Sequence, residues 1–237
     1  RPPTVFFRLF VTIVETLLVT LGVSDIPVIG SALPPCRFRS SYRPLMSFLL
    51  VAAALDEEVA ELRRRHPGLT VLVTGPGKVL AAAGLAARLA AERPAEVLVL
   101  GTAGALRPDL AGAHEVGLVA QHDYDDASIR ALVGRTYGAP IPLAGGGPHL
   151  ATGDLFVADA DHVARLAARG YGLVDMEGYA YAHVCAVAGI PVRIVKAVSD
   201  GADGEAAASW AANVQRCAEL LANWYDDDYR SAARSAH

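Results

Sequence analysis

The feature that most constrains the fold of this chain is residues 172–203, GLVDMEGYAYAHVCAVAGIPVRIVKAVSDGAD, which alternates strand-like and helix-like segments. After a short apolar strand, residues 178–188 form a run of small residues that predicts a helix. Gly189 stands where helices commonly end with a positive φ. Pro191 then opens a β-branched strand over residues 192–198. A strand, helix and strand in this order indicate an α/β protein.

Two carboxylates lie at the edges of this unit. Glu177 is at the turn from strand to helix, and Asp200 lies just past the end of the following strand. In an open α/β sheet, both places face the crevice where ligands bind. Each carboxylate also has a purely structural interpretation, because Glu177 could satisfy a helix N-terminus and Asp200 could serve as a turn or cap residue. On these residues alone, both interpretations stay open.

The chain before this unit repeats the alternation of strands and helices. The expected strands are residues 48–55, 69–73, 97–100 and 116–120 and a short strand that ends at 156–157. The expected helices follow a cap at Asp56, a tight turn at 75–78 and a start at Asp159 or Asp161, and a closing helix covers 205–225. Residues 121–150 hold turn residues and little periodicity, and loops of that length are often functional. This order predicts a layered αβα sandwich.

Composition excludes several classes of partner and site. With 237 residues, of which 53% are hydrophobic, the chain can bury one sizeable core. A net charge of −4 gives no signal for nucleic-acid binding. Cys36, Cys185 and Cys217 lack CxxC spacing, so we expect a reducing cytoplasm and neither a disulfide framework nor a zinc cluster. His122 and the aspartates after it are too loose a set for a metal site, so no metal is expected.

Residues 1–45 differ from the rest of the chain. Residues 9–23 are apolar but short and interrupted by Glu15, which does not make a convincing membrane span. A signal-like segment is an alternative, against which stand that central charge and the irregular stretch 34–39. We expect residues 1–45 to be an extension outside the fold, and residues 46–237 to form the domain that carries the candidate site, without membrane contact.

Residues 174–184 (VDMEGYAYAHV) and 199–203 (SDGAD) closely resemble the purine nucleoside phosphorylase and nucleosidase superfamily, and most of all the 5'-methylthioadenosine/S-adenosylhomocysteine nucleosidases. The other matching segments, in chain order, are 55–59 (LDEEV), 75–79 (GPGKV), 101–106 (GTAGAL) and 153–157 (GDLFV). The similarity covers residues 47–225, and the ordered set is more specific than any single motif. The resemblance implies a three-layer αβα sandwich around a mixed, twisted sheet, a homodimer, and no cofactor.

The resemblance also implies hydrolysis of the N-glycosidic bond of a purine nucleoside, with roles for particular residues. Asp200 would be the acid at the purine, and Glu58 would be the base that activates water at C1'. Glu177 would accept hydrogen bonds from the ribose hydroxyls. The other substrate contacts implied are Met176 at the sugar, Phe156 and Val157 at the purine, and Ala103, Gly104 and Ser199 beside ribose and base. Taken singly, Glu58 also suits any first helical turn, and Phe156 in a strand also suits a core.

Two alternatives to hydrolysis stay open. A phosphorylase would need cationic groups for phosphate. The strand 97–100 leads into Gly101 without an arginine, although Lys78 or Arg107 could reach phosphate. A catalytically silent nucleoside-binding protein is the other alternative, because the family's extra hairpin before Gly75 is missing and residues 128–147 resemble their counterpart poorly. The group accepted at the 5' position is open for the same reason.

Two aromatic residues receive further expectations. Trp210 stands where the family has a phenylalanine in its lid helix, and it is a possible substitute. His183, on the small-residue helix, is expected to be a hydrogen-bonded core or interface residue.

Overall fold

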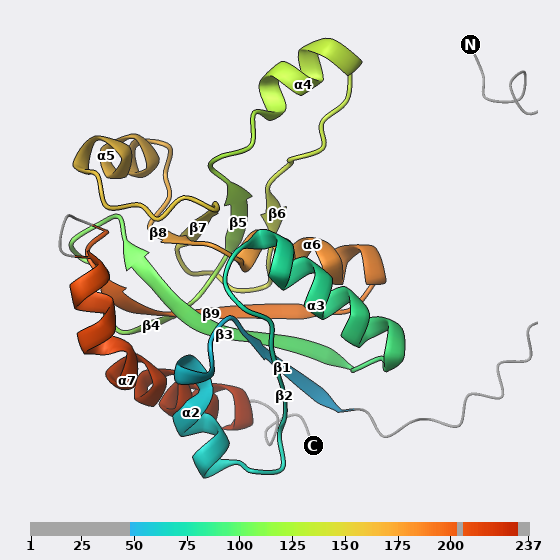
Figure 1. Cartoon of the computed structure of the whole chain (residues 1–237), viewed down its shortest axis with the longest axis vertical. Helices are drawn as coiled ribbons and strands as arrows, with labels where there is room; N and C mark the ends of the chain where they lie inside the picture. Colours follow the sequence, from blue (N-terminus) through green and yellow to red (C-terminus); the bar gives the residue numbers. More distant parts are fainter. Residues whose placement is uncertain (1–47, 203–205, 232–237) are drawn as a thin grey trace, which may run out of the picture. The chain divides into compact units, whose positions relative to one another are not determined.

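The computed structural model describes residues 48–202 and 206–231 (Figure 1). The expected N-terminal extension over residues 1–45 lies outside the described residues and stays a prediction. The same holds for Asp203 of the SDGAD motif and for Glu205, the expected first residue of the closing helix.

Nine strands of the described chain form one mixed sheet. Their bounds are β1 (Leu49–Ala53), β2 (Thr70–Val73), β3 (Glu96–Ala105), β4 (Ala113–Glu115), β5 (Leu118–Gln121), β6 (Ile141–Pro142), β7 (His149–Thr152), β8 (Leu173–Asp175) and β9 (Val192–Asp200). The main order is β2-β1-β3-β8-β7-β5-β6, and β9 pairs with both β3 and β4. The pairs β3 with β8, β4 with β9, and β5 with β6 are antiparallel, and the others are parallel.

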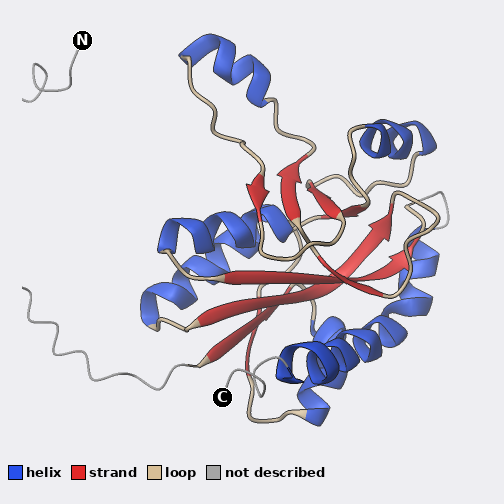
Figure 2. Ribbon diagram, turned by 180° about the vertical axis from the view of Figure 1, so that it is seen from behind, coloured by secondary structure: helices blue, strands red, loops and turns tan. Residues whose placement is uncertain are grey.

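Helices cover both faces of this sheet, which gives the expected three layers (Figures 1 and 2). The helical elements are α2 (Asp56–Arg65), α3 (Lys78–Ala91), α4 (Asp126–Val133), α5 (Ala160–Ala168), α6 (Gly178–Ala188), α7 (Ala206–Trp224) and the π-helical turn η1 (Tyr225–Tyr229). In β1, Leu50 belongs to the core under α3 and α6, and Val51 to the core under α2 and α7. Because side chains alternate along a strand, apolar residues at both positions allow β1 to be covered on both faces.

Two of the predicted signals at helix ends are confirmed, and a third is not. Helix α6 runs from Gly178 to Ala188, and Gly189 adopts φ 63° at its end. Asp159 caps α5 by accepting a hydrogen bond from the backbone N–H of His162 at 2.9 Å. By contrast, Asp56 is not a cap: it is the first residue of α2, with Leu55 at the N-cap.

The strand expected at 97–100 is longer than predicted and includes the glycine-rich segment that follows it. Strand β3 continues through it to Ala105, because its residues pair with β9 on one side and, at Gly104, with β8 on the other. A register shift against β9 falls between Ala103 and Gly104. Such bulges bend a strand and redirect its side chains. Here the bulge lies opposite residues 198–200, where β9 ends.

The middle of the chain also holds more structure than expected. The strand expected at 116–120 corresponds to β5, which begins two residues later, and β4 before it was not predicted. The segment 121–150, expected to be irregular, contains α4 and β6. Helix α4 is held by its own polar residues, since Asp125 accepts from Ser128 N–H and Asp126 accepts from the N–H groups of Tyr137 and Gly138. Residues 156–157, by contrast, have less regular structure than expected. They do not end a strand, because β7 stops at Thr152 and an irregular loop follows.

No helix in the described ranges is long and apolar enough to cross a membrane.

Candidate functional site

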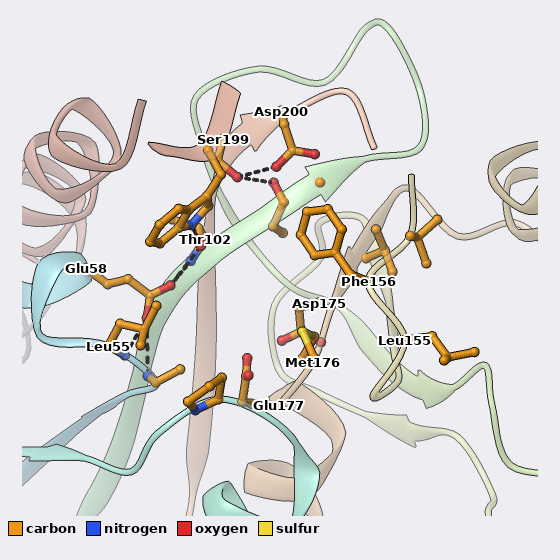
Figure 3. A pocket seen from close by; sticks show the side chains of 17 residues that line it. Leu55, Glu58, Thr102, Leu155, Phe156, Asp175, Met176, Glu177, Ser199 and Asp200 are labelled. Atoms are coloured by element: carbon orange, nitrogen blue, oxygen red, sulfur yellow. Dashed lines mark hydrogen bonds between the residues drawn. The ribbon is translucent and has the colours of Figure 1, made fainter. Parts of the chain in front are cut away.

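A cavity of about 260 Å³ lies at the carboxyl ends of β1, β3, β8 and β9 (Figure 3). Its lining residues are Ala54, Leu55, Glu58, Pro76, Thr102, Ala103, Gly104, Leu155, Phe156, Val157, Val174, Asp175, Met176, Glu177, Ser199, Asp200 and Trp210. All nine residues predicted for the site are among them. The folding topology therefore brings together segments that are far apart in the sequence, at the place where α/β sheets bind ligands.

Glu58 is buried in the first turn of α2, and its carboxylate accepts four hydrogen bonds. Oε1 accepts from the backbone N–H of Thr102 at 2.7 Å and from the Thr102 hydroxyl at 2.8 Å. Oε2 accepts from the N–H groups of Ala54 at 3.2 Å and Leu55 at 3.1 Å. These donors connect the end of β1 to the middle of β3, so Glu58 does more than complement the dipole of its own helix.

Glu177 is not used to cap its own helix. The N-terminus of α6 is capped by Asp175, whose Oδ2 accepts from Gly178 N–H at 2.8 Å. Glu177 instead accepts from the N–H of Gly77 at 2.7 Å, across to the turn that precedes α3. At φ 91°, Gly77 has a backbone conformation that other residues rarely adopt, and this conformation presents its N–H to Glu177.

The environment of Glu177 is strongly unfavourable to a negative charge. Burial, followed by the negative charge of Asp175, raises the pKa of Glu177 from 4.5 to about 7. Glu58 adds to this rise, and Lys196 and the Gly77 N–H oppose it. The carboxyl group is therefore poised to change its charge near neutral pH, which is common at functional sites.

Lys196, in the middle of β9, is the feature of this region that the sequence prediction missed. Its side chain is 2% exposed, and Nζ lies 2.8 Å from Oδ2 of the equally buried Asp175. Burial alone would lower the pKa of Lys196, but Asp175, Glu177 and Glu58 raise it above its usual value, so the ammonium group stays charged. The available signal was a lysine within an apolar strand, because a buried lysine needs a charge partner.

The Lys196 ammonium group and the Glu58 carboxylate both lie close to Gly101. A methyl group on Gly101 would lie 2.9 Å from Lys196 Nζ and 3.3 Å from Glu58 Oε1. A side chain at this position would therefore displace either the cation or the carboxylate.

Asp200 is the last residue of β9, which runs two residues past the end expected at 198. Its Oδ2 accepts from the Ser199 hydroxyl at 2.7 Å, and its Oδ1 accepts from the N–H of Ala202 at 2.8 Å. The second contact is a local hydrogen bond within a turn, as predicted by the interpretation of Asp200 as a turn residue. Asp200 nevertheless lines the cavity together with Gly104, so the turn holds the carboxyl group at the ligand space.

Phe156 belongs to the loop after β7 and lines the cavity with Val157 and Met176. It is 54% exposed, so the core interpretation of this residue is wrong. Figure 3 shows Asp200, Phe156, Met176 and Glu177 arranged around one opening. A half-exposed aromatic ring beside carboxylates provides a surface on which a planar heterocycle can stack.

The remaining expectations divide. Trp210 lines the cavity and donates its indole N–H to Thr102 Oγ1 at 3.1 Å. His183 is exposed and stacks on Tyr179 with ring centroids 6.0 Å apart, so it is not a core residue. Within the described chain, no group of three or more His, Cys, Asp or Glu residues could hold a metal ion.

Comparisons with known proteins agree with this geometry. A family model described as the phosphorylase superfamily matches residues 112–225. A 5'-methylthioadenosine/S-adenosylhomocysteine nucleosidase of Treponema pallidum is 50% identical over 58 residues, a match that spans 24% of this chain and only 21% of that protein. The nucleosidase of the same name from Haemophilus influenzae is 30% identical over 169 residues, covering 60% of this chain and 72% of the relative. A solved futalosine hydrolase of Helicobacter pylori has a TM-score of 0.70 at 22% identity, covering 76% of this chain and 96% of that one.

The mixed sheet with a cavity at its strand ends and the matching family model together define an α/β protein of the phosphorylase superfamily. The Haemophilus relative, 30% identical and matched over 72% of its length, narrows the assignment from the superfamily to one family. The chain belongs to the 5'-methylthioadenosine/S-adenosylhomocysteine nucleosidase family.

Proposed function

We propose that this protein hydrolyses the N-glycosidic bond of a purine nucleoside of the 5'-methylthioadenosine/S-adenosylhomocysteine type and releases the free purine base. The observation that carries the proposal is that Glu58, Glu177 and Asp200 line one cavity, although more than a hundred positions separate the first from the others. The names of the relatives support the same reaction.

The proposed reaction assigns opposite tasks to Asp200 and Glu58. As the bond between C1' and the purine nitrogen breaks, its electron pair moves to the base, and Asp200 donates a proton or hydrogen bond to the purine ring. Water attacks C1', and its proton passes to Glu58. A positioned acid or base of this kind contributes roughly 10²- to 10⁴-fold to a rate. Phe156 would stack on the purine, with Val157 beside it.

Glu177 would hold the sugar by accepting hydrogen bonds from the ribose 2'- and 3'-hydroxyls, while Met176 packs on the ring. The hydrogen bond from Gly77 N–H leaves Glu177 able to accept others, since an ionised carboxylate has about four lone-pair positions. Ala103, Gly104 and Ser199 would complete the walls around ribose and base.

Water is favoured over phosphate as the nucleophile by the charge of the cavity. None of the described residues that line it is a lysine or an arginine. Lys78 is bound to Asp123 at 2.6 Å and to Gln121 at 3.1 Å, and Arg107 pairs with Asp109 on the surface. The candidates for phosphate binding are therefore engaged elsewhere, and acidic walls would repel a phosphate ion.

The test is to incubate the full chain with 5'-methylthioadenosine, S-adenosylhomocysteine, futalosine and inosine, each with and without phosphate, and to measure the free base. We expect release from at least one adenine nucleoside without phosphate. Release that requires phosphate would indicate a phosphorylase instead. Binding without turnover would overturn the proposal in favour of a silent nucleoside-binding protein.

A homodimer is also proposed, since three helices leave large apolar side chains exposed. Val79 on α3, Leu132 on α4 and Val187 on α6 are 75%, 80% and 77% exposed. None of the residues of helix α4 is buried. Exposed apolar side chains on such a helix mark an interaction surface. Light scattering is expected to give twice the chain mass of 24.8 kDa, and Val187→Glu is expected to shift it toward the monomer. A monomeric wild-type protein would contradict this.

A cytoplasmic location completes the proposal. Cys185 and Cys217 are both buried free thiols, which suits a reducing compartment.

A further inference from the structure

A chain of two hydrogen bonds connects the start of α7 to the proposed base. The indole N–H of Trp210 donates to Thr102 Oγ1 at 3.1 Å, and the Thr102 hydroxyl donates to Glu58 Oε1 at 2.8 Å. All three residues line the cavity. The two bonds are compatible because the indole N–H uses a lone pair of the hydroxyl oxygen and leaves its proton free for Glu58.

The carboxylate of Glu58 has no free position for a water molecule while this chain is intact. A carboxylate offers about four lone-pair positions, and four donors occupy those of Glu58. Three of these donors are backbone N–H groups, those of Ala54 and Leu55 just after β1 and that of Thr102 within β3, so they cannot turn away. Among the described donors, the Thr102 hydroxyl is the one that can rotate.

We propose that Trp210 is a positioning residue, which holds the Thr102 hydroxyl so that its hydrogen bond can switch from Glu58 to the attacking water. The inference rests on the proposed function. When the hydroxyl rotates, the vacated lone pair of Glu58 accepts a hydrogen bond from water, and the Thr102 hydroxyl donates a hydrogen bond to the oxygen of the same water. As that oxygen attacks C1', the water proton passes to Glu58 and Thr102 keeps its own proton. Throughout, the indole N–H keeps Thr102 Oγ1 in place.

The indole N–H, rather than the bulk of the ring, is the group that matters here. A phenyl ring at residue 210 could still cover the cavity, but it has no donor. Trp210→Phe therefore separates the two contributions. Trp224, on the same helix, is the matched control, because its ring lies 5.1 Å from the Arg193 guanidinium and does not line the cavity.

The first experiment is a double-mutant cycle on base release. Trp210→Phe is expected to lower kcat roughly threefold to tenfold at unchanged KM, as expected for one lost hydrogen bond. Trp224→Phe is expected to leave kcat unchanged. In a Thr102→Val background, Trp210→Phe is expected to have no further effect, and Thr102→Ser is expected to retain the sensitivity to residue 210. Equal losses of kcat in the two backgrounds would show that Trp210 acts by packing, and would overturn the inference.

The second experiment reads the hydrogen bond without activity. The chain has two tryptophans, so an ¹⁵N spectrum has two indole N–H signals. Thr102→Val is expected to move the Trp210 signal upfield and to speed its exchange with water, and to leave the Trp224 signal unchanged. A Trp210 signal insensitive to Thr102→Val would overturn the inference. Hydrolysis without coupling between residues 102 and 210 refutes this inference alone, whereas a wild-type protein that hydrolyses no nucleoside refutes the proposed function and the inference together.

Discussion

Glu177→Gln is expected to make the folded protein more stable at pH 8 while it weakens nucleoside binding. Glu177 is 6% exposed, and burial together with Asp175 raises its pKa to about 7. In the unfolded chain the same group titrates near its usual value of 4.5. The folded protein therefore holds a proton that the unfolded chain releases between these two pH values, so stability falls as the pH rises through this window.

The size of the effect follows from the two pKa values. A rise from 4.5 to about 7 corresponds to about 3 kcal/mol, at about 1.4 kcal/mol for each tenfold change in the protonation equilibrium. Glutamine resembles the protonated form, and its amide oxygen can still accept the hydrogen bond from Gly77. The variant should therefore escape most of the cost of ionisation above pH 7, and gain little at pH 5.

The assay is urea unfolding of both proteins from pH 5 to pH 8. Groups away from the site titrate alike in the two proteins, so the difference in their free energies of unfolding reports residue 177 together with the charges that interact with it. We expect this difference to grow in favour of the variant by about 2 to 3 kcal/mol between pH 5 and pH 8. A difference that does not depend on pH, or a variant less stable than the wild type at pH 8, would refute the reasoning. Loss of substrate binding, measured by calorimetry, is expected in the same variant.

Three further substitutions test the other parts of the site. Asp200→Asn is expected to lower kcat for base release at least about 100-fold with a small change in KM, and a loss of less than threefold would argue against an acid at this position. Phe156→Ala is expected to raise KM about tenfold through lost stacking without lowering the melting temperature, because the ring is 54% exposed; a lower melting temperature would show a structural role instead. Lys196→Met is expected to destabilise the fold by about 3 kcal/mol or more in urea unfolding, since it leaves the buried Asp175 without its cation, and unchanged stability would contradict that pairing.

The elements that could be predicted from sequence are those specified by local signals. Helix α6 has its expected bounds because the small-residue run is bracketed by a turn and by Gly189, which takes φ 63°. The continuation of β3 past residue 100 could not be predicted in this way, because its glycines would suit a loop and are held extended by pairing with β8 and β9. Helix α4 was missed for a related reason: its cap and side-chain contacts give it definition, but it has no buried face to produce a clear apolar period.

The site residues divide along the same line. Glu177 and Asp200 stand at strand ends, and the general rule for α/β sheets is enough to place such residues near one crevice. Glu58, in the first turn of α2, was predicted from the family resemblance instead. The ion pair of Asp175 with Lys196 depends on which strands become neighbours, and β8 and β9 reach each other only through β3. No spacing in the sequence encodes that pairing, although the apolar setting of Lys196 required some partner.

The charge balance of the site connects its stability to its proposed chemistry. Glu58, Asp175 and Glu177 surround a single buried cation, Lys196, and the raised pKa of Glu177 reflects burial together with the uncompensated part of the negative charge. The raised pKa of Glu177 means that a further negative charge is unfavourable at this place, so a positive charge would be favoured there. In the proposed reaction, the ribose becomes positive beside Glu177 as its bond to the purine breaks. The same negative potential that raises the pKa of Glu177 would then stabilise the transition state, without movement of the carboxylates, because they are already held in place by their hydrogen bonds to β3, α6 and the turn before α3.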